Sequence, residues 1–350
     1  MPKVVSALRN RCVAATVGVT LLALGCAPAA PIRSGTSLVS SAGASLAGAT
    51  MPVAYVESPT FSLALDRVDQ RQLPLDSTYR HYGSGAGVTV YVFDGGVLAS
   101  HPELAGRVRR GYDAFPDGPA VCNAHGTAVA GAVAGATLGV APEAEIVDVK
   151  MVDCRLMRGT VEAIVRATRW MLADLARHPG RRAVANWSFI ADTVADIPVL
   201  DAAVSALNDA GVPVVVAAGN LDMNACRIAP ANSPGTIVVG ASRVRRAIGA
   251  AALLDERAPG TAYGPCVDLF APGDSVLLPS IDLTGHPVSQ LWTGTSMSAG
   301  YVSGAIALYL EAHPFATPEA IADHLRSSAA GVRVDALKSP WAGMLYVGMR

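Results

Sequence analysis

The sequence feature that most constrains the fold is a regular alternation of strand-like and helix-like segments that begins near Gly87. Residues 88–93 form a short apolar run rich in β-branched side chains, which is typical of a buried strand. The same alternation predicts further strands at 145–152, 183–189, 212–218, 236–241 and 267–270, and helices at 126–135, 161–177, 200–210, 301–313 and 318–328. Such a pattern predicts an α/β fold with a mostly parallel central sheet and helices on both of its faces.

Residues 61–350 are expected to form one domain, since this stretch contains neither an internal repeat nor a second boundary. Two segments of different composition precede it. Residues 1–25 combine three basic residues with a short apolar run, which is typical of a signal peptide. Residues 26–60 are rich in Ala, Ser, Gly, Thr and Pro and hold few charges. We expect them to be a flexible tether rather than a folded inhibitory propeptide.

Two processing outcomes of the leader remain open. Ala27-Pro28-Ala29 offers a small-residue cleavage site, which would release a freely exported protein. Alternatively, Ala23-Leu24-Gly25-Cys26 is similar to a bacterial lipoprotein box, in which Cys26 would carry lipid and anchor the chain to a membrane. Both outcomes predict export from a bacterial cell, to the periplasm, the cell envelope or the medium.

Charge and cysteine content narrow the classes of function. The formal net charge is -1, so the chain lacks the basic surplus of a nucleic-acid-binding protein. Beyond the leader and tether there are four cysteines, Cys122, Cys154, Cys226 and Cys266. Four cysteines in an exported chain predict two disulfides, with three pairings open from counting alone. The sequence lacks a Cys-x-x-Cys spacing, which would favour a zinc site instead. We expect a monomer.

Four polar residues stand where a parallel sheet gathers its ligands, beyond the carboxyl ends of the strands. Asp94 follows the strand at 88–93, His125 opens a small-residue helix, Asn220 follows an apolar run, and Ser296 begins another helix. Each alone is ordinary, as a turn former, a structural histidine, a loop residue or a helix cap. Together they supply an acid, a base, an amide donor and a hydroxyl at a helix N-terminus, where negative charge is favoured. This combination predicts a hydrolytic site with a serine nucleophile.

The motifs around these residues resemble those of the subtilisin-like serine proteases. They are Asp94-Gly95-Gly96, His125-Gly126-Thr127, Ala217-Ala218-Gly219-Asn220 and Gly294-Thr295-Ser296-Met297. The chain is most similar to the proteinase K and aqualysin branch, and the order Asp, His, Ser separates it from the α/β-hydrolases. Over residues 61–350 the resemblance implies a three-layer subtilisin-like fold and serine endopeptidase activity on polypeptide substrates. It implies no cofactor for catalysis.

The resemblance also implies a role for each of the four residues. Ser296 would be the nucleophile and His125 its general base. Asp94 would hold the imidazole in the required tautomer. The Asn220 side chain and the Ser296 backbone N–H would donate to the oxyanion.

Two structural features follow from the same branch. The first is a cysteine pairing, with Cys122 joined to Cys154 and Cys226 to Cys266. The second is a structural calcium ion, held by two main-chain carbonyls and one carboxylate. In this sequence the matching positions are Pro234, Thr236 and Asp268. Oxygen ligands of this kind suit calcium.

The sequence departs from the family where substrate is expected. Family members bind an extended peptide between two edges, and glycines keep the pocket between them open. Here one edge reads Leu156-Met157-Arg158-Gly159 and the other Ser188-Phe189-Ile190-Ala191, while Ala217, Ala218 and Gly219 are expected to line the pocket. Ile190 replaces a glycine, which predicts either a preference for small P1 residues or loss of ordinary proteolysis. Gly300 and Tyr301, after the serine, also differ from the family's Pro-His.

Two functions are therefore compatible with the sequence. The first is an exported serine endopeptidase with a restricted S1 pocket. The second is a catalytically impaired pseudoprotease that acts as a secreted or membrane-anchored peptide-binding protein. Retention of all four polar residues favours the first function.

Overall fold

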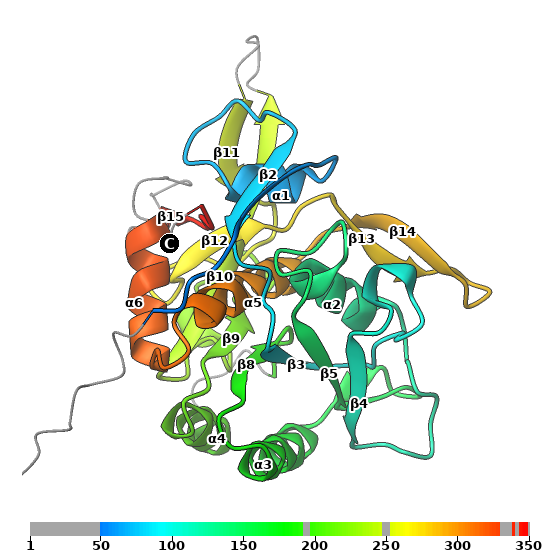
Figure 1. Cartoon of the computed structure of the whole chain (residues 1–350). Helices are drawn as coiled ribbons and strands as arrows, with labels where there is room; N and C mark the ends of the chain where they lie inside the picture. The colour runs from blue at the N-terminus through cyan, green and yellow to red at the C-terminus, as the bar shows by residue number, and fades with distance from the viewer. Residues whose placement is uncertain (1–49, 192–196, 247–252, 330–337, 340–342, 349–350) are drawn as a thin grey trace, which may run out of the picture. The chain divides into compact units, whose positions relative to one another are not determined.

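The computed structural model describes residues 50–191, 197–246, 253–329, 338–339 and 343–348. Its centre is a nine-stranded sheet in which eight strands are parallel, in the order β15-β12-β10-β9-β8-β3-β5-β4 (Figure 1). These strands are β3 (Val88–Asp94), β4 (Val108–Asp113), β5 (Glu145–Lys150), β8 (Arg182–Trp187), β9 (Val214–Ala217), β10 (Thr236–Arg246), β12 (Leu269–Pro272) and β15 (Gly343–Met344). The ninth strand, β11 (Leu253–Arg257), pairs antiparallel with β10. The mostly parallel sheet predicted from the sequence is confirmed.

Helices cover both faces of this sheet, as the alternation predicted. On one face lie α2 (His125–Ala134) and α5 (Thr295–Ala312), and on the other lie α3 (Val161–Arg177) and α4 (Pro198–Asp209) (Figure 1). Central strand β3 is buried along its whole length and contributes side chains to both hydrophobic cores, one on each face of the sheet. Val90 and Val92 pack into the first core, whereas Tyr91 and Phe93 pack into the second. This is the period of two expected of a strand.

Helices α2 and α5 touch closely because α5 carries glycine at the contact. A Cβ on Gly300 would lie 2.9 Å from both the Ala132 Cβ and the Val129 carbonyl oxygen. Tyr301, the next residue, is fully buried in the same core. The sequence departures at these two positions therefore belong to helix packing and not to the substrate groove.

Smaller elements surround the sheet. They are the hairpins β1 (Tyr55–Pro59)–β2 (Thr78–Tyr82), β6 (Val152–Asp153)–β7 (Arg158–Gly159) and β13 (Val276–Ile281)–β14 (Pro287–Trp292), and the helices α1 (Leu63–Val68), η2 (Pro102–Leu104), η3 (Ala225–Arg227) and α6 (Pro318–Ala329). Among the helices of the described ranges, none is both long enough and apolar enough to cross a bilayer.

The expected tether at 26–60 needs correction at its end. Residues 55–59 form β1, whose register with β2 runs from Tyr55 opposite Tyr82 to Pro59 opposite Thr78. The backbone N–H of Met51 also donates to the Ala312 carbonyl. Backbone pairing to a partner strand orders a segment whose own composition buries little. Residues 1–49, which include the predicted leader and Cys26, lie outside the described residues.

Candidate active site

The first part of the site is a contact between a strand end and a helix start. Asp94 is the last residue of β3, and His125 is the first residue of α2. The imidazole Nδ1–H donates to Asp94 Oδ2 at 2.7 Å, and the Gly95 N–H donates to Asp94 Oδ1 at 2.7 Å. An ionised carboxylate can only accept, so Nδ1 must carry the proton. Nε2 is thereby left as the basic nitrogen of neutral His125.

Glycines make this close approach feasible. Gly96 has a φ of +102°, and a Cβ on it would lie 2.3 Å from the Ala120 carbonyl oxygen. A Cβ on Gly126 would lie 3.0 Å from the Asp94 Cβ. The side-chain-free turn after Asp94 and the side-chain-free second residue of α2 together let the carboxylate meet the imidazole.

The pKa of His125 is shifted by two opposed effects. Burial of the imidazole lowers its pKa, but the negative charge of Asp94 and the hydrogen bond to Asp94 outweigh this effect. The pKa of His125 therefore lies above its ordinary value of 6.5. A second carboxyl on the neighbouring strand, Asp148, is buried, and burial raises its pKa to about 7.

Ser296 is the second residue of α5 and is only 7% exposed. Its hydroxyl donates to the Ser188 carbonyl oxygen at 3.1 Å, and the Ser188 hydroxyl donates back to the Ser296 carbonyl oxygen at 2.9 Å. In this structure the serine hydroxyl is therefore bonded to the substrate edge rather than to His125. Catalytic hydrogen bonds commonly form only once substrate is bound, so this geometry is compatible with a nucleophile.

Asn220 is oriented by Thr295. Its Oδ1 accepts from the Thr295 N–H at 2.9 Å and from the Thr295 hydroxyl at 3.1 Å. Because both of these partners are donors, the bonds assign the acceptor end of the amide to Thr295. The Nδ2 donors are then directed elsewhere, and a Cβ on Gly294 would lie 3.4 Å from Nδ2. The amide donor thus lies beside the start of α5.

A network of buried polar side chains is hydrogen-bonded to Ser188, which in turn bonds Ser296. Asn186 Nδ2 donates to the Ser188 hydroxyl at 2.8 Å, and the Ser303 hydroxyl donates to Asn186 Oδ1 at 2.9 Å. All three side chains are buried. Because Ser188 also bonds Ser296, the network links the end of β8 to two positions of α5 that lie about two turns apart. Fully bonded buried networks of this kind fix one arrangement of the groups they join.

A cavity of about 790 Å³ opens beside Asp94 and His125. Both predicted substrate edges line it, with the residues Leu156, Met157, Arg158, Gly159, Ser188, Phe189, Ile190 and Ala191. Within the described chain, Ala217, Ala218 and Gly219 do not line it. They end central strand β9 or follow it and are buried, and a Cβ on Gly219 would lie only 3.5 Å from Ile190 Cγ2. Ile190 thus lies beside Gly219, and the structure does not bring these three residues into the cavity lining, so their contact with substrate stays a prediction.

Large apolar side chains form much of the rim of this cavity. Leu156 is 59% exposed, Met157 is 51% exposed and Ile190 is 40% exposed. Met157 adopts a positive φ of 51°, which a non-glycine residue rarely does. Three exposed apolar side chains around one cavity indicate a binding surface rather than a folding requirement.

Trp292, at the end of β14, is a site residue that the sequence reasoning missed. Its ring meets His125 edge-on, with centroids 6.1 Å apart and an interplanar angle of 75°, and it lines the cavity. Its Nε1 is buried without a hydrogen-bond partner among the described residues. Its position in the sequence could have indicated this, because Trp292 lies only two residues before the Gly294-Thr295-Ser296 motif.

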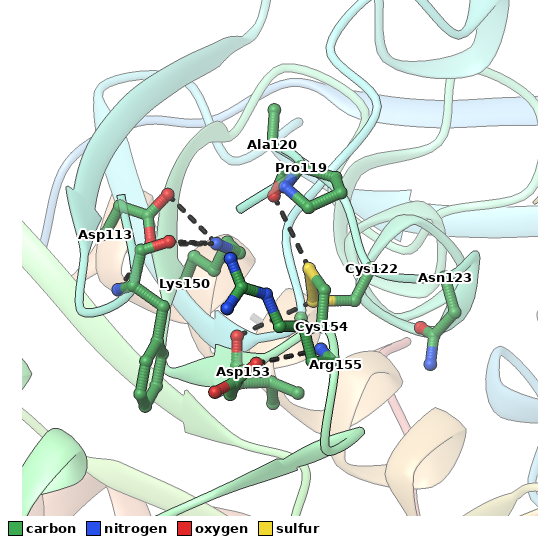
Figure 2. Close-up of a disulfide and its surroundings, with 12 residues drawn as sticks. Asp113, Pro119, Ala120, Cys122, Asn123, Lys150, Asp153, Cys154 and Arg155 are labelled. Atoms are coloured by element: carbon green, nitrogen blue, oxygen red, sulfur yellow. Dashed lines mark hydrogen bonds and ion pairs between the residues drawn. A yellow bond between two sulfur atoms is a disulfide. The ribbon is translucent and has the colours of Figure 1, made fainter. Parts of the chain in front are cut away.

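The described chain holds two disulfides, in the pairing that the resemblance implied. Cys122 is joined to Cys154, and Cys226 to Cys266. Figure 2 shows the first of these beside Pro119, whose carbonyl oxygen lies 3.4 Å from Cys154 Sγ. Cys122 lies three residues before His125, and Cys154 two residues before Leu156. The bond therefore ties the loop before His125 to the first predicted substrate edge.

The residues assigned to calcium do not fit the ion as the structure places them. Asp268 Oδ1 accepts from Arg326 Nε at 2.8 Å, and Oδ2 accepts from the Val238 N–H at 2.8 Å. The only carboxylate of the Pro234, Thr236 and Asp268 set is thus already paired with a cation. Elsewhere in the described ranges, no group of three or more His, Cys, Asp or Glu side chains is placed to hold a metal.

Comparisons with known proteins agree with this geometry. Residues 85–340 match the model of the Subtilase family. The chain is 40% identical over 274 residues to an extracellular serine proteinase of Thermus sp. (strain Rt41A), which covers 77% of this chain and 62% of the relative. It is 35% identical over 286 residues to alkaline serine exoprotease A of Vibrio alginolyticus, covering 81% of this chain and 49% of the relative.

A solved structure is similar as well. The crystal structure of a cold adapted subtilisin-like serine proteinase matches with a TM-score of 0.70 and 35% identity, over 84% of this chain and 100% of the other. The chain spans roughly half to two thirds of the length of the two relatives named above. The family match covers most of the chain, and the structural match supports the same fold. The chain belongs to the subtilase family.

Proposed function

We propose that this protein is an exported serine endopeptidase that uses Asp94, His125 and Ser296, with Asn220 as an oxyanion donor. The observation that carries the proposal is the 2.7 Å contact between His125 Nδ1 and Asp94 Oδ2 at the carboxyl edge of the sheet. This contact fixes the tautomer that a general base needs. The amide of Asn220 and the hydroxyl of Ser296 belong to the same edge through their bonds to Thr295 and Ser188.

Acylation follows from these groups. The Ser296 hydroxyl leaves the Ser188 carbonyl and transfers its proton to His125 Nε2 as Oγ attacks the scissile carbonyl carbon. Asn220 Nδ2 and the Ser296 N–H donate to the resulting oxyanion. His125 then returns the proton to the leaving amine, which departs as the acyl-enzyme forms. A water molecule, deprotonated by His125, releases the acid product and restores Ser296.

The substrate we propose is an extended polypeptide with a small P1 residue. The two edges Leu156–Gly159 and Ser188–Ala191 face one cavity, in which a peptide could pair with backbone on either side. A Cβ on Gly219 would lie 3.5 Å from Ile190 Cγ2, and a branched side chain this close to Gly219 supports a pocket that accepts only a small P1 side chain. The apolar rim favours apolar side chains elsewhere along the peptide.

Export is proposed from the leader-like residues 1–25 and from the two relatives, which are named an extracellular serine proteinase and an exoprotease. Cleavage near Ala27-Pro28-Ala29 gives a free enzyme, and lipidation of Cys26 gives an anchored one. The mass of the mature N-terminal peptide distinguishes these two products. We propose that the exported enzyme acts as a monomer.

Labelling with a fluorophosphonate tests the proposal directly, because the reagent phosphonylates only an activated serine. We expect the native chain to be labelled and Ser296→Ala to be unlabelled. Ser298→Ala is the matched control, since Ser298 is a buried serine of the same helix that bonds only main-chain carbonyls. It should keep its label. Absence of labelling in the folded native chain would contradict the proposal and favour a peptide-binding protein without turnover.

A further inference from the structure

The carboxylate expected to hold calcium is engaged by a helix instead. Asp268 lies directly before β12, and Arg326 belongs to α6. Their Nε to Oδ1 distance is 2.8 Å, and the side chain of Asp268 is 16% exposed. Arg326 Nη1 also lies 3.1 Å from Asp323 Oδ1 of the same helix. The guanidinium of Arg326 therefore pairs with two carboxylates, Asp268 before β12 and Asp323 of α6.

Arg326 shares its surroundings with Thr236, another residue of the expected calcium set. A hollow of about 490 Å³ is lined by Gly235, Thr236, Glu319 and Arg326, among others. Thr236 begins β10, and Pro234 precedes it by two residues. The positive charge thus stands beside the backbone whose carbonyls were expected to face the ion.

Calcium and the guanidinium of Arg326 cannot both bind the Asp268 carboxylate at the same time. Calcium takes six to eight oxygen ligands and needs the free lone pairs of a carboxylate. The guanidinium of Arg326 stays protonated at any ordinary pH and carries only donors. Asp268 Oδ2 is meanwhile taken by the Val238 N–H. A calcium ion could bind Asp268 only by displacing Arg326.

We propose that Arg326 takes the place of a calcium ion in this chain and joins α6 to β10 and β12 with an attached cation. The sheet edge then keeps its neutralising charge when calcium is absent. Removing the guanidinium should uncover a latent calcium site at Asp268, with the carbonyls of Pro234 and Thr236 completing its ligands.

Thermal unfolding in EDTA and in millimolar calcium tests this inference. All variants are made in the Ser296→Ala chain, so that self-digestion does not distort the midpoint. In EDTA, Arg326→Ala should unfold about 2 °C or more below the parent, since a half-exposed ion pair contributes modestly. The decisive quantity is the rise in Tm on adding calcium. It should be larger in Arg326→Ala than in the parent by about 2 °C or more.

Three further variants define the outcome. Arg326→Lys keeps the charge and should retain the parent's calcium response. Arg326→Ala with Asp268→Asn should lose the added response, because the carboxylate is gone. Arg177→Ala removes another helix arginine, which pairs with Asp174, and should respond as the parent does. An equal calcium response in the parent and in Arg326→Ala, whatever their midpoints in EDTA, would overturn the inference.

Discussion

The two sides of the cavity differ in how they depart from the family pattern. On the catalytic side, Asp94, His125 and Asn220 are each held by short hydrogen bonds to neighbours of the same edge. On the substrate side, Ile190 stands where the family has a glycine, and Leu156 and Met157 are exposed. Under the proposed function, the groups that would move protons are retained, whereas the wall that would select a peptide differs from the family pattern.

Other residues that differ from the family pattern lie outside the cavity lining, and helix packing explains them. Gly300 allows α5 to approach α2, and Tyr301 fills the core behind it. Ala128 is likewise fully buried in α2. None of these three residues lines the described part of the cavity. Asp94, His125, Leu156, Met157 and Ile190 do line it, whereas Asn220 is not among its described lining residues.

The largest expected effect comes from the catalytic side. His125→Ala removes the base, and kcat for a peptide with a small P1 residue should fall by about 10⁶-fold, a magnitude taken from subtilisin itself rather than derived for this chain. Initial rates at saturating substrate measure it. His125 lines the cavity but belongs to neither predicted substrate edge, so KM should change little. A variant that kept more than about one hundredth of the native kcat would break the assignment of the chemistry to this side.

The next effect concerns the oxyanion donor. Asn220→Ala should lower kcat by about 10²- to 10³-fold, again a magnitude known from subtilisin, with KM nearly unchanged. Thr295→Val removes one of the two bonds that orient the amide and should lower kcat by a smaller factor. Steady-state kinetics on one peptide compares the two. If both variants raised KM and spared kcat, the donor would serve binding and not the transition state.

Removing a disulfide should separate stability from substrate binding. The bonds span 32 and 40 residues, so each should contribute about 3–4 kcal/mol to the free energy of unfolding in the chain-entropy account. Cys122→Ser with Cys154→Ser and Cys226→Ser with Cys266→Ser should therefore lose similar stability in urea. Only the first pair ties His125's loop to the Leu156 edge, so only its removal should raise KM clearly. Equal KM values in the two variants would contradict that link.

A smaller effect is the position of the acid limb of activity. Neutral His125 is the base, so kcat/KM should fall as pH drops through its pKa. Asp94 raises that pKa above 6.5, and the limb should therefore lie on the alkaline side of 6.5. The pH profile of kcat/KM between pH 5 and 9 measures it. A limb well below 6.5 would show that burial of the imidazole outweighs the charge of Asp94.

Much of the fold was predictable because it rests on local patterns. The strand at 88–93 is apolar along its length, as a strand buried on both faces must be. Asp94 and His125 could be placed together because strand ends and helix starts meet at one edge of a parallel sheet. Strand β1 was missed, since its order comes from pairing with β2 rather than from its own composition.

The remaining surprises depend on contacts between residues far apart in the chain. Arg326 and Asp268 are 58 residues apart, and nothing in either local sequence announces their bond. Ser296 and Ser188 are 108 residues apart, and their paired hydrogen bonds became visible only in the structure. The burial of Ala217 and Ala218 likewise follows from the central place of β9 in the sheet. Such contacts need three-dimensional coordinates.

The most direct test of the account is the ratio of kcat/KM values for two peptides that differ only in P1, alanine in one and phenylalanine in the other. The native enzyme should favour alanine by at least about tenfold if, as proposed, the Ile190 side chain beside Gly219 restricts the P1 pocket. Ile190→Gly should raise kcat/KM for the phenylalanine peptide by about 10- to 200-fold and leave the alanine peptide nearly unchanged. Leu156→Gly, on the opposite edge, should leave the ratio as it is. Equal cleavage of both peptides by the native enzyme would contradict the separation of a retained catalytic side from a changed wall.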